Sequence, residues 1–324
     1  MIINSQFKPA PGLSGAHIQT LLPSLLRSGC RDDFRKQTIE LDDGDFLDLC
    51  WTNTPHDGKP IVIVFHGLEG SICSPYAQGI MAQIRHNNWT GLLMHFRGCS
   101  GRPNRLSRSY HSGDTSDAKY LLNWLSSHYP DSALSAIGYS LGGNMLLKLQ
   151  AELADHSPLK ATISVCAPLV LDECAAKLNR GFSKFYQHHL LGRLKRNLRH
   201  KYTQHDFKQL INLGKQDIKQ LNNFRLFDDR VTAPLHGFKG VNDYYSVSSA
   251  RQYLSKITKP ALMIHSLDDP FMSKSVIPEA SELSATTVLE ISRYGGHVGF
   301  ISGHMFKPVF WLEQRISEYL DEFI

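Results

Sequence analysis

The chain has 324 residues, of which 42% are hydrophobic and 20% are charged, and its formal net charge at pH 7 is +5. These fractions are ordinary for a globular protein. The sequence shows no internal repeat and no low-complexity tract, which disfavours a solenoid or a disordered scaffold. The positive charge is modest for this length and is not gathered into tails, so it gives little support to nucleic-acid binding.

The cysteines give no sign of a metal site or a disulfide framework. They lie at positions 30, 50, 73, 99, 166 and 174, with no Cys-x-x-Cys pair and no zinc-like spacing to histidine. We therefore expect reduced thiols in a cytoplasmic protein. Residues 1–11 lack the pattern of a signal peptide, and the apolar run at 21–26 is interrupted by Pro23, so no membrane span is expected.

We expect residues 1–36 to form an N-terminal arm, followed by a hairpin with strands at 38–41 and 46–51. The residues between these strands, Asp42-Asp43-Gly44-Asp45, contain the Asp-Gly pair that favours a tight turn. From there the pattern changes to apolar runs of strand length that alternate with helical stretches. The predicted strands are 61–65, 91–96, 133–137, 161–166, 261–265 and 287–291, and the predicted helices are 75–87, 114–128, 141–154 and 306–322.

This alternation is typical of an α/β protein with a mostly parallel sheet and helices on both faces. Asp114 and Asp117 stand at the start of one predicted helix in the spacing of a capping box. We expect these acids to cap the helix rather than to catalyse.

Between residues 167 and 245 the alternation stops and the chain becomes helical, charged and irregular. We expect this segment to be an inserted helical cap on a core formed by residues 1–166 and 246–324. Apolar residues recur at helical spacing from Phe182 to Leu198, and the same helix has a basic face. That face comprises Lys184, Arg193, Lys195, Arg196, Arg199 and Lys201. We expect it to be solvated, and the alternative is transient contact with an anionic lipid surface.

The pentapeptide Gly138-Tyr139-Ser140-Leu141-Gly142 lies between a predicted strand and a predicted helix. In this context G-x-S-x-G predicts a nucleophile elbow, a sharp turn whose crowding requires glycine on both sides of the serine. The N–H of Leu141 would then lie at a helix N-terminus, where it can stabilise an oxyanion. A chance match would be only a tight turn, so the prediction depends on a base and an acid further along the chain.

Two later loops supply these groups in the order Ser, Asp, His that is usual in α/β-hydrolases. His297 follows paired glycines after the last predicted strand, and we assign it as the general base. Asp269 follows the strand at 261–265, and we assign it as the acid that orients the imidazole. The apolar residues after Pro270 favour Asp269, while Asp268 remains the alternative.

The second oxyanion donor should come from the loop after residues 61–65, which reads His66-Gly67-Leu68-Glu69-Gly70. We assign the backbone N–H of Leu68 to this role. Four further histidines lie beside strand ends, but out of order for a base. We expect them to be structural or to line the pocket; they are His66, His95, His111 and His265.

Several segments together resemble the α/β-hydrolase 4 family, YheT-like esterases related to eukaryotic ABHD-type lipases. The matching stretches are 17–20, 66–70, 96–101, 110–114, 138–143, 243–245, 268–271 and 295–300. The resemblance covers nearly the whole chain and implies an α/β-hydrolase fold. It also implies hydrolysis of carboxylic esters, with Ser140, Asp269 and His297 as the charge relay. Eukaryotic members often carry a membrane anchor, which is not seen here, so the resemblance suggests a soluble, bacterial-type member.

We therefore expect a serine esterase, either a short-chain carboxylesterase or one similar to monoacylglycerol lipases, that needs neither a metal nor an organic cofactor. An acyltransferase or a thioesterase could use the same relay, and a non-catalytic ligand-binding protein is the alternative from another class. In the loop from Arg97 to Arg108, Arg97 or Arg102 could meet a carboxylate or a phosphate on a substrate. We expect these arginines instead to hold the loop in place.

Overall fold

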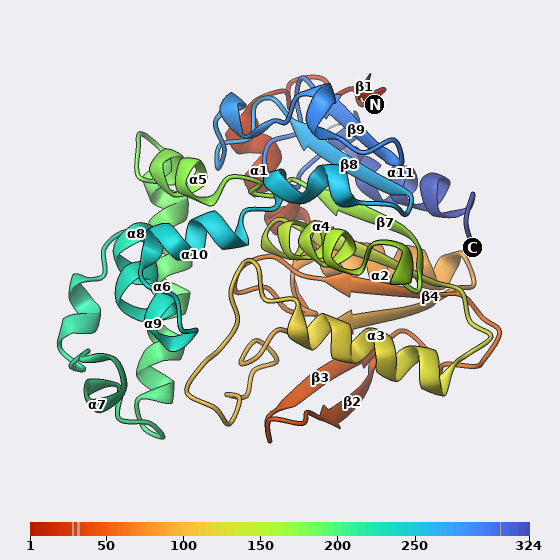
Figure 1. The fold of residues 1–324 in the computed structure, drawn as a ribbon. Helices are drawn as coiled ribbons and strands as arrows, with labels where there is room; N and C mark the ends of the chain where they lie inside the picture. The colour runs from red at the N-terminus through yellow and green to blue at the C-terminus, as the bar shows by residue number, and fades with distance from the viewer. Residues whose placement is uncertain (28, 31–32, 305) are drawn as a thin grey trace.

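A nine-stranded sheet runs through the centre of the protein and carries helices on both faces (Figure 1). The computed structural model describes residues 1–324 except 28, 31, 32 and 305. The strands follow the order β1-β9-β8-β7-β6-β4-β5-β3-β2. Their bounds are β1 Ile2–Asn4, β2 Arg35–Glu40, β3 Phe46–Trp51, β4 Ile61–Phe65, β5 Thr90–Met94, β6 Leu134–Tyr139, β7 Leu159–Val165, β8 Ala261–Ser266 and β9 Thr287–Ser292.

In this spatial order, every pair of neighbouring strands from β1 through β9, β8, β7, β6 and β4 to β5 is parallel. Strand β3 pairs antiparallel with both β5 and β2. This confirms the predicted hairpin and the mostly parallel sheet. Because the parallel strands all end at one edge, the loops after β4, β6, β8 and β9 meet there. Those four loops hold the residues that we assigned to catalysis.

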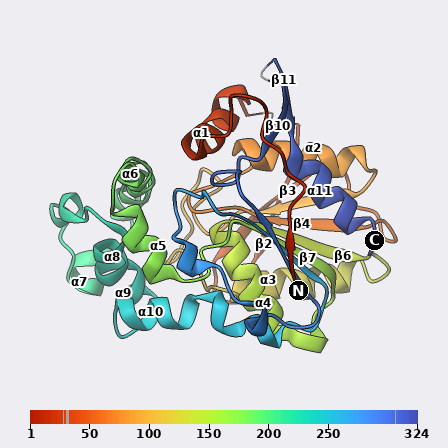
Figure 2. The same ribbon diagram turned by 90° about the horizontal axis from the view of Figure 1, so that it is seen from above.

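Alternate residues of β4 face the two helical layers. Val62 and Val64 pack with α2 (Pro75–His86) and α11 (Trp311–Leu320), whereas Ile61 and Ile63 pack with α3 (Ser116–His128) and α4 (Leu141–Leu153). All four side chains are fully buried. The two layers lie on opposite sides of the sheet in Figure 2. Burial of both faces explains why the strand is a continuous apolar run.

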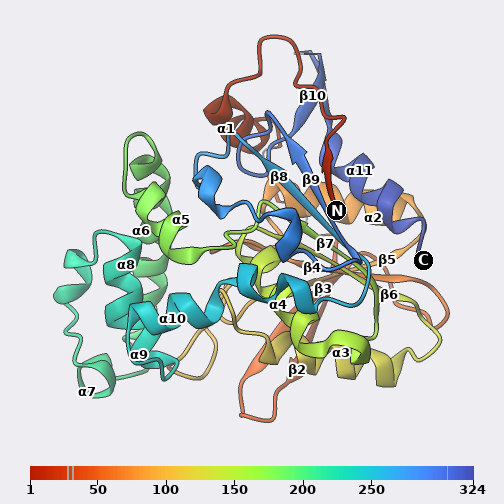
Figure 3. The same cartoon turned by 45° about the horizontal axis from the view of Figure 1, so that its top comes forward.

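Between β7 and β8 the chain forms six α-helices beyond the edge at which the strands end (Figure 3). They are α5 Leu171–Leu178, α6 Ser183–Lys201, α7 Phe207–Ile211, α8 Phe224–Phe227, α9 Ala233–Leu235 and α10 Val241–Ser248. Tyr186, Leu198 and Phe207 belong to a buried cluster formed largely within this insertion. The division of the chain into a core and a cap stays a prediction.

The C-terminal helix is shorter than predicted. Residues 307–310 form β11 (Lys307–Phe310), which pairs antiparallel with β10 (Ile301–His304), and the helix begins only at Trp311. Gly303, within β10, has a φ of +79°, a conformation that favours glycine. The helical interpretation of 306–310 was therefore wrong because strand pairing takes up these residues.

The predicted capping box at Asp114 and Asp117 is also wrong. Helix α3 begins after Thr115, whose side chain makes no capping hydrogen bond to the described residues. Asp117 instead accepts two hydrogen bonds from Arg97, at 2.6 and 2.7 Å, and Asp114 accepts from Ser116 and Arg108. The acids neutralise arginines of the preceding loop rather than cap backbone amides.

Lys201 was assigned to the solvated basic face, and the structure corrects this. The residue is only 4% exposed. Its Nζ donates to Asn104 Oδ1, Arg108 O and Ser109 Oγ at 2.7–3.2 Å. Burial lowers the pKa of this ammonium to about 7. Lys201 therefore attaches the end of α6 to the arginine-rich loop.

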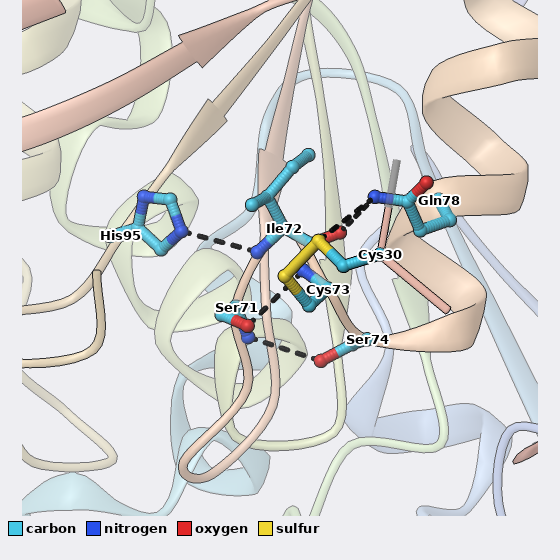
Figure 4. The surroundings of a disulfide bond; sticks show 7 residues. All are labelled: Cys30, Ser71, Ile72, Cys73, Ser74, Gln78 and His95. Atoms are coloured by element: carbon cyan, nitrogen blue, oxygen red, sulfur yellow. Dashed lines mark hydrogen bonds between the residues drawn. A yellow bond between two sulfur atoms is a disulfide. The ribbon is translucent and has the colours of Figure 1, made fainter. Parts of the chain in front are cut away.

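The expectation of reduced cysteines is wrong for one pair. Cys30 and Cys73 form a disulfide that joins the segment after α1 (Ala16–Leu26) to the loop after β4 (Figure 4). The two residues are 43 positions apart, and only the path of the arm brings them together. The sequence analysis expected a cytoplasmic protein because it expected all cysteines to be reduced, and the disulfide removes that reason. In the described part of the chain, none of the helices has both the length and the apolar character needed to cross a bilayer.

Candidate active site

Ser140 lies at the turn between β6 and α4 with φ +51° and ψ −118°. A Cβ on Gly138 would lie 2.5 Å from Gly142 O, and a Cβ on Gly142 would lie 2.5 Å from Phe65 O. Both flanking positions therefore require glycine. The serine N–H donates to Val165 O at 2.8 Å, which holds the strained turn against β7.

The structure brings Ser140, His297 and Asp269 into one hydrogen-bonded row. Ser140 Oγ lies 3.0 Å from His297 Nε2, and His297 Nδ1 lies 2.8 Å from Asp269 Oδ2. Asp269 is buried, and its other oxygen accepts the Phe271 N–H at 2.8 Å. A buried carboxylate on Nδ1 favours the tautomer that leaves Nε2 free to accept a proton from the serine.

Asp268, the alternative acid, faces elsewhere. Its Oδ1 accepts the Gly296 N–H at 2.9 Å, so it holds the loop that precedes the histidine. Burial raises the pKa of Asp268 above its usual value. The contact with the imidazole belongs to Asp269.

Two neighbours of His297 were not predicted from the sequence. The ring of Phe271 stacks on the imidazole at 3.9 Å with an interplanar angle of 7°. Thr20 of α1 accepts the His297 N–H through Oγ1 at 2.9 Å. The motif at 17–20 was noted only as part of a resemblance, and no local pattern places it beside the last loop. These contacts fix the ring plane and the backbone of the histidine.

The loop after β4 packs directly against the serine. A Cβ on Gly67 would lie 3.3 Å from Ser140 Cβ, and the Gly67 N–H donates to Tyr76 Oη at 2.8 Å. Leu68 and Leu141 both line the cavity above Ser140. Within the described residues neither of their amides donates to a protein acceptor. Two unpaired amides that line the same cavity as Ser140 are the kind of donor that an oxyanion hole needs.

Burial lowers the pKa of each of the four remaining histidines near the strand ends, and three of them, His66, His95 and His111, accept a hydrogen bond from a backbone N–H. His66 Nε2 accepts the Phe96 N–H at 3.1 Å, and burial lowers the pKa of His66 to about 3. His95 Nε2 accepts the Ile72 N–H at 3.1 Å, and burial lowers its pKa as well. Burial also lowers the pKa values of His111, to about 4, and of His265.

The arginine-rich loop is held by carboxylates. The buried Arg97 lies 2.6 Å from Asp117, 2.7 Å from Asp43 and 3.2 Å from Asp45. Arg102 binds Asp48 through two hydrogen bonds. These guanidinium groups already have anionic partners, which supports the expected loop-holding role.

Glu69, next to Leu68, is a centre of contacts that the sequence did not reveal. Tyr110 Oη accepts the Glu69 N–H at 2.8 Å and donates to Oε1 at 3.1 Å. From α6, Asn197 donates to Oε2 at 2.5 Å and Arg193 donates to the carbonyl oxygen at 3.1 Å. Burial raises the pKa of the carboxyl to about 7, although Tyr110, Arg193 and Arg196 act to lower it.

A cavity of about 810 Å³ extends from Ser140 and His297 toward the insertion. Its apolar lining includes Leu21 of α1 and Phe185, Leu190 and Leu194 of α6. A cavity of this size and character suits a small apolar ligand or an acyl chain.

Among the residues that the structure describes, two groups of side chains have the proximity that a metal ion needs, with ligand atoms within 4.8 Å of one another. They are His111, Asp114 and His236, and Cys166, Asp269 and His297. In the first group the Gly113 N–H donates to His111 Nδ1, and the side chains of Ser116 and Arg108 donate to the carboxylate of Asp114. In the second, Asp269 and His297 bind each other. Because at least two side chains in each group already have partners, we assign no metal to either group.

Comparisons with known proteins agree with this architecture. Residues 60–303 match the family model described as the alpha/beta hydrolase fold. The "Putative esterase YheT" of Escherichia coli (strain K12) is 43% identical over 99% of this chain and 94% of its own length. The "Phospholipase ABHD3" of Bos taurus is 24% identical over 94% and 76%. The esterase Pf2001 of Pyrococcus furiosus has the same fold, with a TM-score of 0.57 and 16% identity over 92% of this chain and 96% of that one.

Proposed function

The chain belongs to the α/β-hydrolase fold family, and we propose that it is a serine esterase that cleaves carboxylic esters through Ser140, His297 and Asp269. The observation that carries the proposal is the continuous row from Ser140 Oγ through the imidazole to Asp269 Oδ2, with links of 3.0 and 2.8 Å. A serine hydroxyl is a weak nucleophile by itself, and this arrangement supplies the base and the orienting acid that activate it.

In the proposed mechanism, His297 Nε2 accepts the serine proton as Ser140 Oγ attacks the ester carbonyl carbon. The N–H groups of Leu68 and Leu141 stabilise the negative oxygen of the tetrahedral intermediate. His297 then donates the proton to the leaving alcohol oxygen, and the acyl group stays on Ser140. A water molecule, deprotonated by the same imidazole, hydrolyses the acyl-enzyme and restores the serine.

For the substrate, we propose an ester with an apolar acyl group that occupies the α6 side of the cavity. The support is the apolar lining from Phe185, Leu190 and Leu194. A relative named "Monoacylglycerol lipase" in Saccharomyces cerevisiae is 26% identical over 82% of this chain and 60% of its own length, which makes a lipid-derived ester a reasonable first choice.

A series of p-nitrophenyl esters of increasing acyl length tests this function. We expect turnover by the full chain, with kcat/KM rising with acyl length until the chain fills the cavity. Absence of turnover across the whole series would contradict the proposal.

Glu69 should give the activity a pH dependence of its own. Its carboxyl has a raised pKa of about 7, so the charged form that best accepts from Asn197 and Tyr110 develops as pH rises through neutrality. We expect Glu69→Gln to remove the Glu69 ionisation from the rising limb of log kcat/KM against pH, which lowers the limiting slope of that limb by about one.

Asn212→Asp, an exchange between amide and carboxyl on an exposed residue after α7, serves as the control and should keep the wild-type profile. Superimposable profiles for Glu69→Gln and the wild type would show that Glu69 does not affect the reaction.

A further inference from the structure

Helix α1 has a second apolar face that the fold leaves uncovered. Its inner side is fixed by the buried Gln19, which donates to Leu13 O and Ile301 O, and by Leu22, which packs on the same region. Apolar side chains on other faces of the helix are exposed to solvent. They are Ile18 at 45%, Leu21 at 36%, Leu25 at 73% and Leu26 at 44%. Ile18, Leu21 and Leu25 are spaced three and four residues apart, so they form one stripe.

The stripe continues onto the start of α6. Phe182 and Phe185 are 55% and 56% exposed, and their rings lie 5.7 Å apart. His17 of α1 connects the two helices, because its ring lies 4.4 Å from that of Phe182 and its Nδ1 lies 3.0 Å from Tyr186 Oη. We call the six exposed residues the mouth patch: Ile18, Leu21, Leu25, Leu26, Phe182 and Phe185.

The mouth patch lies at the cavity that contains Ser140. Leu21 and Phe185 belong both to the patch and to the lining of this cavity. Both helices lie on the side of the sheet where the insertion stands (Figure 2). An apolar surface that joins a cavity opening can receive an apolar ligand without first exposing it to water.

Positively charged side chains stand next to part of the mouth patch in the sequence. Lys184 lies between the two exposed phenylalanines in sequence, and Arg180 precedes them. Farther along α6, Arg196 and Arg199 are also exposed. Within the described residues, none of these four side chains forms an ion pair with a carboxylate. Arg180 and Lys184, cations next to the exposed phenylalanines in the sequence, match the chemistry of an anionic lipid surface.

The helix that carries the stripe is held firmly on the core. Arg27, just after α1, forms an ion pair with Glu313, donates to Pro75 O at 3.2 Å and covers the Phe310 ring. The disulfide between Cys30 and Cys73 follows a few residues later (Figure 4). Thr20, on the same helix, accepts the N–H of His297. A surface seated on α1 would therefore have a fixed position relative to the catalytic loop.

We propose that the mouth patch docks the protein on an anionic lipid surface, so that an ester held in that surface enters the cavity directly. The entry of the ester rests on the proposed function. The docking itself does not require Ser140, so the two ideas can fail separately.

Sedimentation with phosphatidylcholine vesicles, with and without about one third phosphatidylglycerol, tests the docking. We expect the full chain to bind the anionic vesicles, and Ile18→Ser/Leu25→Ser to lower the partition coefficient about tenfold or more. Neither residue lines the cavity, so turnover of soluble p-nitrophenyl butyrate should stay at the wild-type level. Leu210→Ser/Val247→Ser removes two exposed apolar side chains elsewhere and should leave binding unchanged.

Three results would overturn the docking proposal. They are a wild-type protein that does not bind anionic vesicles, equal binding by the patch and control variants, and self-association through the patch in place of vesicle binding. Equal binding to neutral and anionic vesicles would contradict its electrostatic part. If Ser140→Ala binds vesicles as the wild type does while the wild type cleaves no ester, the docking holds and the proposed function fails.

Discussion

Replacing Ser140 with alanine should reduce turnover of a short p-nitrophenyl ester by about four orders of magnitude or more in kcat. The change removes the only nucleophilic atom in the row with His297 and Asp269, while leaving the amides of Leu68 and Leu141 in place. Residual activity above the rate in water would come from those amides and from binding. The measurement is initial-rate kinetics with purified protein.

The same variant should keep its fold, because the Ser140 hydroxyl contacts only the imidazole among the described groups. Its thermal unfolding midpoint should match the wild type. Ser24→Ala is the matched control, since this serine also lines the cavity but lies outside the row. Full turnover by Ser140→Ala would refute the assignment of the nucleophile.

Replacing Asp269 with asparagine should lower kcat by about 10³- to 10⁴-fold. An amide at this position can donate to His297 Nδ1, which would favour the tautomer with a proton on Nε2 and prevent the base from accepting the serine proton. Kinetics over a pH range give the comparison.

The neighbouring change Asp268→Asn is the natural control. It keeps an oxygen that can accept the Gly296 N–H, now 2.9 Å from Asp268 Oδ1, and it does not touch the imidazole. We expect a loss of no more than about tenfold. A larger loss for Asp268→Asn than for Asp269→Asn would reverse the assignment of the two acids.

The sequence predicted the elements whose patterns are local. The β4 run at 61–65 is apolar throughout because both of its faces are buried, and the elbow requires glycine at 138 and 142 because any Cβ there would meet backbone oxygens. The helix predicted at 306–322 failed in its first part, since residues 307–310 pair with a strand. Helical spacing in the sequence could not indicate that pairing.

The candidate site was predictable where chain order carries the information. Ser140, Asp269 and His297 follow the parallel strands β6, β8 and β9, and parallel pairing brings the loops after these strands to one edge of the sheet. The contacts that surround them were not predictable, because they join distant segments: Thr20 with His297, and Glu69 with α6. The disulfide between Cys30 and Cys73 was not predictable for the same reason, since the path of the N-terminal arm brings the two cysteines together.

The central claim, that Ser140 is an activated nucleophile, is tested most directly by labelling with a fluorophosphonate. Such a probe phosphonylates a serine that a neighbouring base activates, with loss of fluoride. We predict one adduct on the intact protein, located by peptide mass spectrometry at Ser140 and absent from Ser140→Ala. An unlabelled wild-type protein, or an adduct on another serine that persists in Ser140→Ala, would contradict the account.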